Sequence, residues 1–254
     1  MISDPQGTVL ALFAAFCRIG ACFMTLPGFG SLRVPMRVRA LLALALSLAI
    51  LPMVWSTVYP KVTADLGAGP SSYLRLVGSE VLIGATLGLV ARYYVLALQF
   101  ASVSVSMLIG FNSMSSLDIP EATPQTELAT LINFVGLLLL FVLNFHAIVI
   151  RALVNSYDFM PLGQVFDPQM ALSTLADTLS SAFMVILQLT SPFLVYSLVF
   201  NITIGMINKL APQIPIYFIS LPFIITGGLI LFYYGSSEFF DVFVRQFPTV
   251  FLGQ

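Results

Sequence analysis

The run from Tyr73 to Phe111 is almost continuously apolar, and it limits the fold more than any other part of the sequence. As a helix rising about 1.5 Å per residue, it would be nearly twice as long as the hydrocarbon core of a bilayer, which is about 30 Å thick. One simple membrane span cannot contain it. The segment must either bend back or project well beyond the bilayer.

Further apolar runs lie on both sides of this segment. Only 8% of the residues are charged and 59% are hydrophobic, whereas charge in a soluble domain is near a quarter. The mean hydropathy of +1.00 agrees. The sequence therefore predicts an all-α membrane protein without a separate soluble domain, in which the other spans are Val9–Leu26, Ala40–Trp55, Leu131–Val154, Leu179–Ile207 and Ile214–Tyr234.

Breakers and polar residues set the expected boundaries of these spans. Pro52 and Pro60 are expected to close the second span, before a polar connection over 61–72. Leu131–Val154 is the cleanest single span, and an acidic connection over 155–178 follows it. The chain ends in an amphipathic tail, 235–254, with Phe239, Phe240, Phe243 and Phe247 at helical spacing.

The basic residues predict the orientation of the chain. Arginines 33, 37 and 39 share one side with Lys209, and the positive-inside rule puts both termini outside the cytoplasm.

The stretch from Met107 to Thr130 interrupts the apolar pattern. Gly, Asn and Ser come first, followed by Asp118, Pro120 and further acidic residues and prolines. Unpaired backbone groups in hydrocarbon cost several kcal/mol each, so this stretch cannot lie in lipid. It must lie at a membrane surface, within protein or in a water-filled passage.

Arg18 and Glu80 are charged residues well inside apolar segments. An ionisable group at such a depth is a functional candidate by default. One interpretation is a structural ion pair in which each charge neutralises the other. The sharper one is that Glu80 lines a polar pathway and takes up protons.

Small residues recur every four positions along the third run. Gly84 and Gly88 form a GxxxG pattern, and Ser102 and Ser106 continue it toward Gly110 on a later face. In membranes this spacing lets helices approach closely. The pattern predicts a tightly packed, oligomeric surface rather than one exposed to lipid.

Catalytic and metal-binding patterns are missing from the sequence. It contains no GxSxG or phosphate-binding loop, and the single histidine, His146, has no further ligands at metal-site spacing. Cys17 and Cys22 are interpreted as small apolar residues. A net charge of -1 gives no case for nucleic acid. We therefore expect that the protein is not an enzyme, needs no cofactor and does not bind nucleic acid.

Four separated stretches resemble the FliR family of flagellar biosynthesis proteins, which has counterparts in virulence-associated type III secretion. Arg18 precedes the first stretch, and the overall pattern favours the flagellar branch. One departure is Ile119, which separates Asp118 from Pro120 where many members carry Asp-Pro directly. The stretches are PGFGSLRVPMRVRALLALALS (27–47), EVLIGATLGL (80–89), GFNSMSSLDIP (110–120) and APQIPIYFISLPFIITGGL (211–229).

The resemblance implies a subunit of the type III export gate in the bacterial inner membrane, at the flagellar basal body. The expected partners are FliP, FliQ, FlhB, membrane lipid and unfolded export substrates. Residues 1–178 would form a FliP-like helical region. Residues 179–254 would form a FliQ-like helical hairpin and tail, with Lys209, Pro212 and Gln213 at the hairpin tip.

For the central stretch, the resemblance implies a channel plug over about 109–121. Its small residues would yield to a passing chain, and its larger apolar residues would block ions. The runner-up function is a secondary transporter of a small solute, although no convincing internal repeat supports it. The candidate plug residues are Ile109, Gly110, Phe111, Asn112, Ser113, Met114, Ser115, Ser116, Leu117, Asp118, Ile119 and Pro120.

Overall fold

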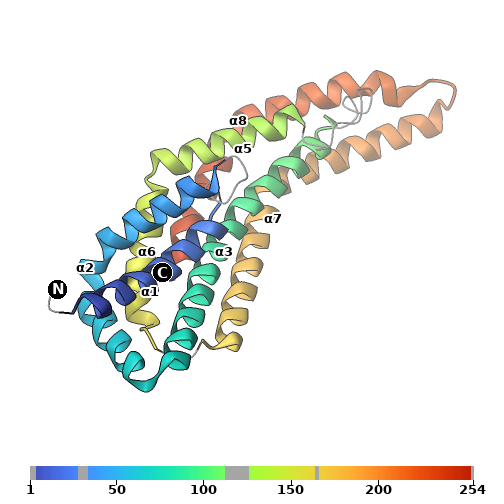
Figure 1. The fold of residues 1–254 in the computed structure, drawn as a ribbon. Helices are drawn as coiled ribbons and strands as arrows, with labels where there is room; N and C mark the ends of the chain where they lie inside the picture. The colour runs from blue at the N-terminus through green and yellow to red at the C-terminus, as the bar shows by residue number, and fades with distance from the viewer. Residues whose placement is uncertain (1–3, 28–33, 112–125, 164–165, 253–254) are drawn as a thin grey trace. The chain divides into compact units, whose positions relative to one another are not determined.

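The computed structural model describes residues 4–27, 34–111, 126–163 and 166–252, and every regular element among them is a helix (Figure 1). This confirms the all-α prediction. The helices are α1 (Pro5–Thr25), α2 (Met36–Ala68), α3 (Pro70–Leu108), α5 (Glu127–Val142), α6 (Phe145–Phe159), α7 (Pro168–Leu210) and α8 (Ile216–Leu252).

Local sequence explains where several helices begin. Asp4 precedes Pro5, and its side chain accepts a hydrogen bond from the Gly7 amide at 3.1 Å. Asp167 precedes Pro168 in the same way and accepts from the Gln169 amide at 2.9 Å. A carboxylate that caps the free amides and a proline in the first turn are a strong helix start.

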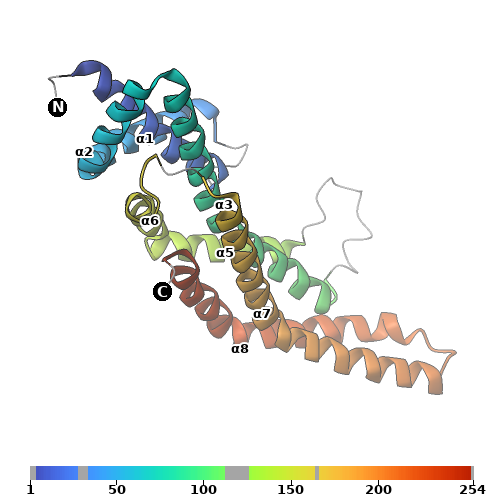
Figure 2. The same ribbon diagram turned by 90° about the horizontal axis from the view of Figure 1, so that it is seen from below.

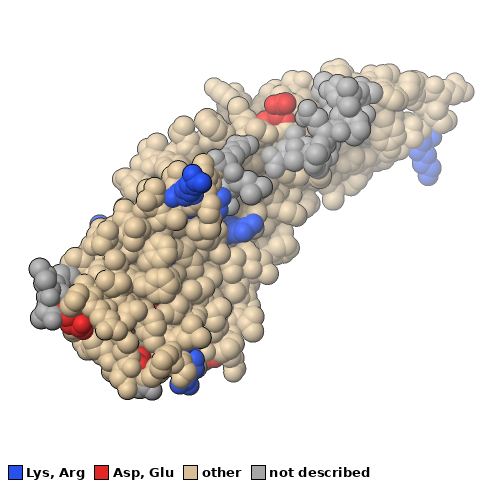
Figure 3. Space-filling view, in the orientation of Figure 1, with Lys and Arg blue, Asp and Glu red and all other residues tan. Residues whose placement is uncertain are grey.

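Five of the helices are long and apolar enough to cross a membrane, and α5 and α6 together would make a sixth span. Helix α3 has 39 residues, which gives a length of about 58 Å, and α7 has 43 residues, or about 64 Å. The prediction that the third run is too long for one span is therefore confirmed. Charged side chains cover little of the face drawn in Figure 3.

Two predicted breaks in the chain are absent. Pro52 and Pro60 both lie inside α2, which continues to Ala68 and leaves only Gly69 before α3. The expected end near Trp55 is therefore wrong. A proline removes one backbone donor, and membrane helices tolerate it because Ser and Thr side chains and neighbouring helices bond the freed groups.

The expected single span Leu131–Val154 is also wrong, because α5 and α6 meet there at an angle of 61°. Leu143 caps α5, and Asn144 has a φ of 58°, in the left-handed region. Asparagine enters this region more readily than other side chains. The chain therefore turns at a polar residue within the apolar run.

Helices also replace two segments that the sequence analysis treats as a connection and a separate tail. Most of 155–178 is helical, because α6 continues to Phe159 and α7 already begins at Pro168. The tail from 235 is a continuation of α8 to Leu252. The expected packed face is present in it, since Phe239 and Phe243 are buried.

The chain forms two compact units, to both of which α3 and α7 contribute. The first comprises residues 1–95, 145–179 and 250–254, and in it α1 packs on α2 through small side chains. Ala11, Ala14 and Ala15 of α1 are fully buried. The Tyr73 hydroxyl of α3 donates to the Leu10 carbonyl of α1 at 2.9 Å.

The second unit comprises residues 96–144 and 180–249. Its main feature is a hairpin in which α7 and α8 run side by side in opposite directions (Figures 1 and 2). The Tyr196 hydroxyl donates to the Ile224 carbonyl at 2.7 Å, and Gly227 lies against the same hydroxyl. The predicted division at 178/179 rests on resemblance to other subunits and stays a prediction.

Candidate functional site

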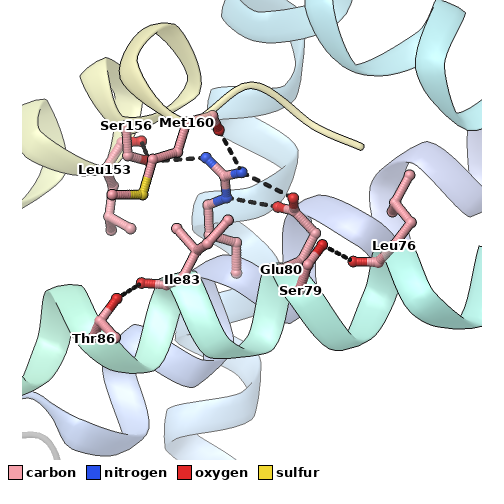
Figure 4. A network of polar contacts seen from close by, with 9 residues as sticks. Leu76, Ser79, Glu80, Ile83, Thr86, Leu153, Ser156 and Met160 are labelled. Carbon is pink, nitrogen blue, oxygen red and sulfur yellow. Dashed lines mark hydrogen bonds and ion pairs between the residues drawn. The ribbon is translucent and has the colours of Figure 1, made fainter. Parts of the chain in front are cut away.

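Arg18 and Glu80 form an ion pair inside the first unit (Figure 4). Arg18 Nε donates to Glu80 Oε2 at 2.6 Å, and Nη2 donates to Oε1 at 2.8 Å. Both side chains are fully buried. The contact is bidentate, the geometry in which a guanidinium binds a carboxylate most strongly.

The guanidinium also binds α6 and the residue that follows it. Nη1 donates to Ser156 Oγ at 3.1 Å, and Nη2 donates to the Met160 carbonyl at 2.9 Å. Ser156 in turn donates to the Leu153 carbonyl at 2.7 Å. The Arg18 Cζ atom lies 4.0 Å from the centre of the Tyr157 ring, within cation–π distance. One side chain of α1 thus joins α3 and α6.

These contacts favour the structural interpretation of the buried charges. A buried charge is tolerated only when it is paired and its remaining donors or acceptors are bonded, and Arg18 meets both conditions. Glu80 directs both carboxylate oxygens at Arg18 rather than into an open passage. A proton pathway would require an accessible carboxylate, and Glu80 is fully buried.

Gly84 and Gly88 lie where α3 crosses α1. A methyl group at position 84 would overlap the backbone carbonyl of Arg18, and one at 88 would overlap the Thr25 hydroxyl. The same hydroxyl lies 3.4 Å from the Ala85 carbonyl of α3. The glycines therefore bring Arg18 close enough to α3 to reach Glu80, which lies one turn before Gly84. In the described residues their close approach is within the chain rather than to another subunit.

Ser102 and Ser106 are fully buried in the second unit. Ser102 donates to the Leu98 carbonyl at 2.7 Å and lies 3.5 Å from Asn133 Oδ1 on α5. The Ser106 hydroxyl has no hydrogen-bond partner within the described ranges. Helix α5 also packs closely on α3 at Gly136, because a methyl group there would overlap the Leu98 side chain.

Only the first three candidate plug residues, Ile109, Gly110 and Phe111, are among the described residues, and they end α3. The Gly110 amide donates to the Met107 carbonyl and the Phe111 amide to the Ser106 carbonyl, both at 3.0 Å. Gly110 has a φ of 90°. This is a Schellman motif, in which glycine supplies the left-handed residue. Gly110 therefore has a fixed role as a helix cap, and Asn112 to Pro120 lie outside the described ranges.

Ile109 is fully buried against α8. A methyl group on Gly228 would come within 2.5 Å of its Cγ2 atom, so the two residues are in contact. Gly110 faces Ile224 and Ile225 at about van der Waals distance. The start of the candidate plug is thus attached to the hairpin of the second unit.

The predicted hairpin tip lies between α7 and α8, since residues 211–215 connect the two helices. Lys209, Pro212 and Gln213 are all exposed there. The described residues contain no group of three or more His, Cys, Asp or Glu side chains that could hold a metal ion.

The partners of Arg18 on α6 were not predicted from the sequence. A signal for them exists in the helical spacing of this segment, because Val149, Ala152, Leu153, Ser156 and Tyr157 are all buried on one face. A helix that continues this face beyond Arg151 would have placed Ser156 inside the protein. Because 155–178 was predicted as a polar connection rather than as helix, Ser156 was not recognised as a buried residue.

Comparison with known proteins gives a match to the family described as bacterial export proteins, family 1, over residues 9–250. The chain is 32% identical to the flagellar biosynthetic protein FliR of Caulobacter vibrioides over 85% of this chain and 84% of that protein. It is 25% identical to FliR of Bacillus subtilis, with 93% and 92% covered, and 26% identical to FliR of Escherichia coli, with 86% and 81% covered.

Proposed function

We propose, because this chain belongs to the bacterial export proteins of family 1, that it is one subunit of the flagellar protein export gate. In this role it forms part of a gated channel for unfolded export substrates. The observation that carries the proposal is the family match over residues 9–250. The relatives named above are flagellar biosynthetic proteins, and their matches to this chain cover most of their length.

The proposal places the chain in the bacterial inner membrane, within the flagellar basal body. Five to six candidate spans support a membrane location. The role is structural rather than catalytic, in keeping with a family described by export alone.

FliP, FliQ and FlhB are the proposed partners, with residues 1–178 as the FliP-like part and 179–254 as the FliQ-like part. The support comes from the α7–α8 hairpin, which leaves many large apolar side chains uncovered. Lipid or other subunits must cover such a surface. The exposed residues include Leu194, Val195, Leu198, Val199, Ile202, Met206, Leu210, Tyr217, Phe218, Phe223, Tyr233 and Tyr234.

Copurification tests this function. The tagged chain, extracted in mild detergent from cells that express the flagellar genes, should elute in one large particle with several small helical membrane proteins. Mass measurement of the intact particle would identify them. Elution as a monomer or dimer without other export proteins would contradict the proposal. That result would favour a small-solute transporter, which the comparisons do not support.

The segment that follows α3, up to Pro120, is proposed to close the channel. Its support is the attachment of Ile109 and Gly110 to α8, which holds the start of the segment in place. The sequence there mixes small serines, such as Ser113, with large apolar residues, such as Met114 and Leu117, and this mixture suits a seal that can yield.

Deletion of 112–120 tests the seal and leaves the Gly110 cap in place. We expect the complex to assemble and the membrane to leak ions, measured as conductance in planar bilayers or as loss of the proton gradient in cells. A Gly/Ser linker of the same length is the matched control, because it keeps the chain length but removes Met114, Leu117 and Ile119. It should leak as well. Unchanged conductance in both variants would refute the plug.

A further inference from the structure

A cavity of about 470 Å³ opens in the first unit, between the end of α2, the start of α3 and the residues after α6. Its polar residues are Asp65, Ser72 and Arg75, which lie at the end where α2 passes into α3. Its other lining residues are small or apolar, and the one further hydroxyl, on Ser79, already donates to the Leu76 carbonyl. They are Leu76, Gly78, Ser79, Leu82, Gly163 and Phe166.

A second, smaller cavity of about 90 Å³ continues along the same helix. Phe166 lines both cavities. The second is mainly apolar, and Figure 4 shows Leu76 and Ser79 of the first cavity followed along α3 by Ile83 and Thr86 of the second. Its residues are Ile83, Thr86, Leu87, Val90, Met160, Phe166, Asp167, Met170, Ala171 and Thr174.

The two cavities share Phe166 and follow one another along α3, and we call them together the groove. Its first part has a charged end, and its second part is apolar apart from Asp167 and two threonines. From Arg75 to Val90 the helix rises about 22 Å. One leaflet of a bilayer, headgroups included, is about 20 Å thick. Helices α2 and α3 are both candidate spans and meet at Gly69, so the charged end lies where both spans end. The groove therefore has the length and the polarity of one lipid molecule.

The charges at the open end are of both signs. Arg75 is exposed and forms no ion pair or hydrogen bond within the described ranges. Asp65 accepts a hydrogen bond from the Ser72 hydroxyl at 3.3 Å and keeps its second oxygen available. A Cβ atom on Gly163 would lie 3.6 Å from Lys61 Cδ and 3.7 Å from Asp65 Oδ2, so Lys61 also reaches this end.

We propose that this groove binds a zwitterionic phospholipid with a phosphate and a primary ammonium group, as phosphatidylethanolamine has. Arg75 and Lys61 bind the phosphate, and Asp65 accepts hydrogen bonds from the ammonium group. One acyl chain lies along Leu82, Leu87 and Val90 against Phe166. We favour a lipid over a segment of a partner protein, because the groove combines positive and negative side chains at one end with an apolar part about as long as one leaflet.

Native mass spectrometry of the purified export complex tests this proposal. The complex is delipidated and then titrated with phosphatidylethanolamine or phosphatidylglycerol, and lipid adducts on this chain are measured. The first lipid should bind more tightly, because only its ammonium group matches Asp65. Glycerophosphoethanolamine, which lacks acyl chains, should not compete at the same concentration. Equal binding of the two lipids, or competition by the free headgroup, would overturn the proposal.

Two variants separate this groove from general lipid association. Arg75→Gln removes one charge-assisted contact and should weaken phosphatidylethanolamine binding by about tenfold. Arg92→Gln is its control, since Arg92 is an exposed arginine of the same helix outside the groove. Gly78→Trp should fill the cavity and prevent binding, because the space beside Gly78 is open.

Gly205→Trp controls for the bulk of the added ring, because Gly205 on α7 also faces open space but is not a lining residue of either cavity. All four variants are compared as assembled complexes of the same subunit composition. Unaltered adducts in Arg75→Gln and Gly78→Trp would refute the site. Loss of adducts in the two control variants as well would show that the lipid is bound elsewhere.

Discussion

Arg18 joins three parts of the first unit through one side chain. Its guanidinium makes four hydrogen bonds, two of them to Glu80 and the others to Ser156 and Met160. A lysine could not reproduce these contacts, because its ammonium group is a point charge without a planar fork. The arrangement ties three helices of the first unit to one side chain.

Removing one partner of this ion pair should be worse than removing both. Arg18→Ala leaves the Glu80 carboxylate buried and unpaired, and should lower the free energy of unfolding by about 3–5 kcal/mol. Arg18→Leu combined with Glu80→Leu should recover most of this loss, since no charge then remains inside. Ser156 keeps its bond to the Leu153 carbonyl in either case.

Thermal unfolding of the purified complex in detergent measures both variants. The same experiment on Glu80→Ala should give a loss similar to that of Arg18→Ala. A double variant that is less stable than either single one would show that the pairing is not the main contribution of these residues.

At the scale of whole helices, glycine decides how closely α1 and α3 approach. Gly84 and Gly88 face backbone and side-chain atoms of α1 that leave no room for a methyl group. Gly110 has a different use, because its left-handed φ ends α3. The sequence analysis grouped Gly110 with the flexible residues of the plug, whereas the described structure gives it a fixed capping geometry.

Gly84→Ala should force α1 away from α3. The blocking atom is a backbone carbonyl that no rotamer change can move, so we expect a loss of about 1–3 kcal/mol in unfolding free energy, as for other overpacked cores. Gly205→Ala is the matched control, because its Cβ would meet nothing within 4 Å. It should be neutral or stabilise the helix by about 0.5–1 kcal/mol.

Melting temperatures of the two complexes in detergent provide the comparison. Equal melting temperatures would mean that α1 and α3 can separate without cost. The Arg18–Glu80 contact should weaken together with the packing, since both join the same two helices.

For the whole molecule, helix length determines how the chain meets the membrane. Helices α3 and α7 are each about twice the thickness of the hydrocarbon core. Each must therefore extend beyond it or lie strongly tilted. In the proposed export complex, the exposed apolar residues of the hairpin would be covered in part by lipid and in part by neighbouring subunits.

Single cysteines test the predicted sidedness of the chain. In a background with Cys17 and Cys22 replaced by Ala, Arg37→Cys and Lys209→Cys should react with a membrane-impermeant maleimide only from the cytoplasmic side. Gln169→Cys lies in the acidic segment 155–178, which the span Leu179–Ile207 separates from Lys209. It should therefore react only from the side opposite to the cytoplasm. Labelling of Arg37→Cys and Lys209→Cys from opposite sides would contradict the six-span topology.

The amino-acid sequence by itself determined the membrane class, the helical fold and the hairpin between α7 and α8, because these follow from apolar length and short-range breakers. The tertiary structure decided which distant residues meet. Arg18 is 62 residues from Glu80 and 138 from Ser156, and no local pattern encodes such pairings. It also decided that α2 runs through two prolines and that the chain bends at Asn144. In α2 the helical context outweighs the tendency of Pro52 and Pro60 to end a helix, whereas at Asn144 the bend agrees with the readiness of asparagine to adopt a left-handed φ.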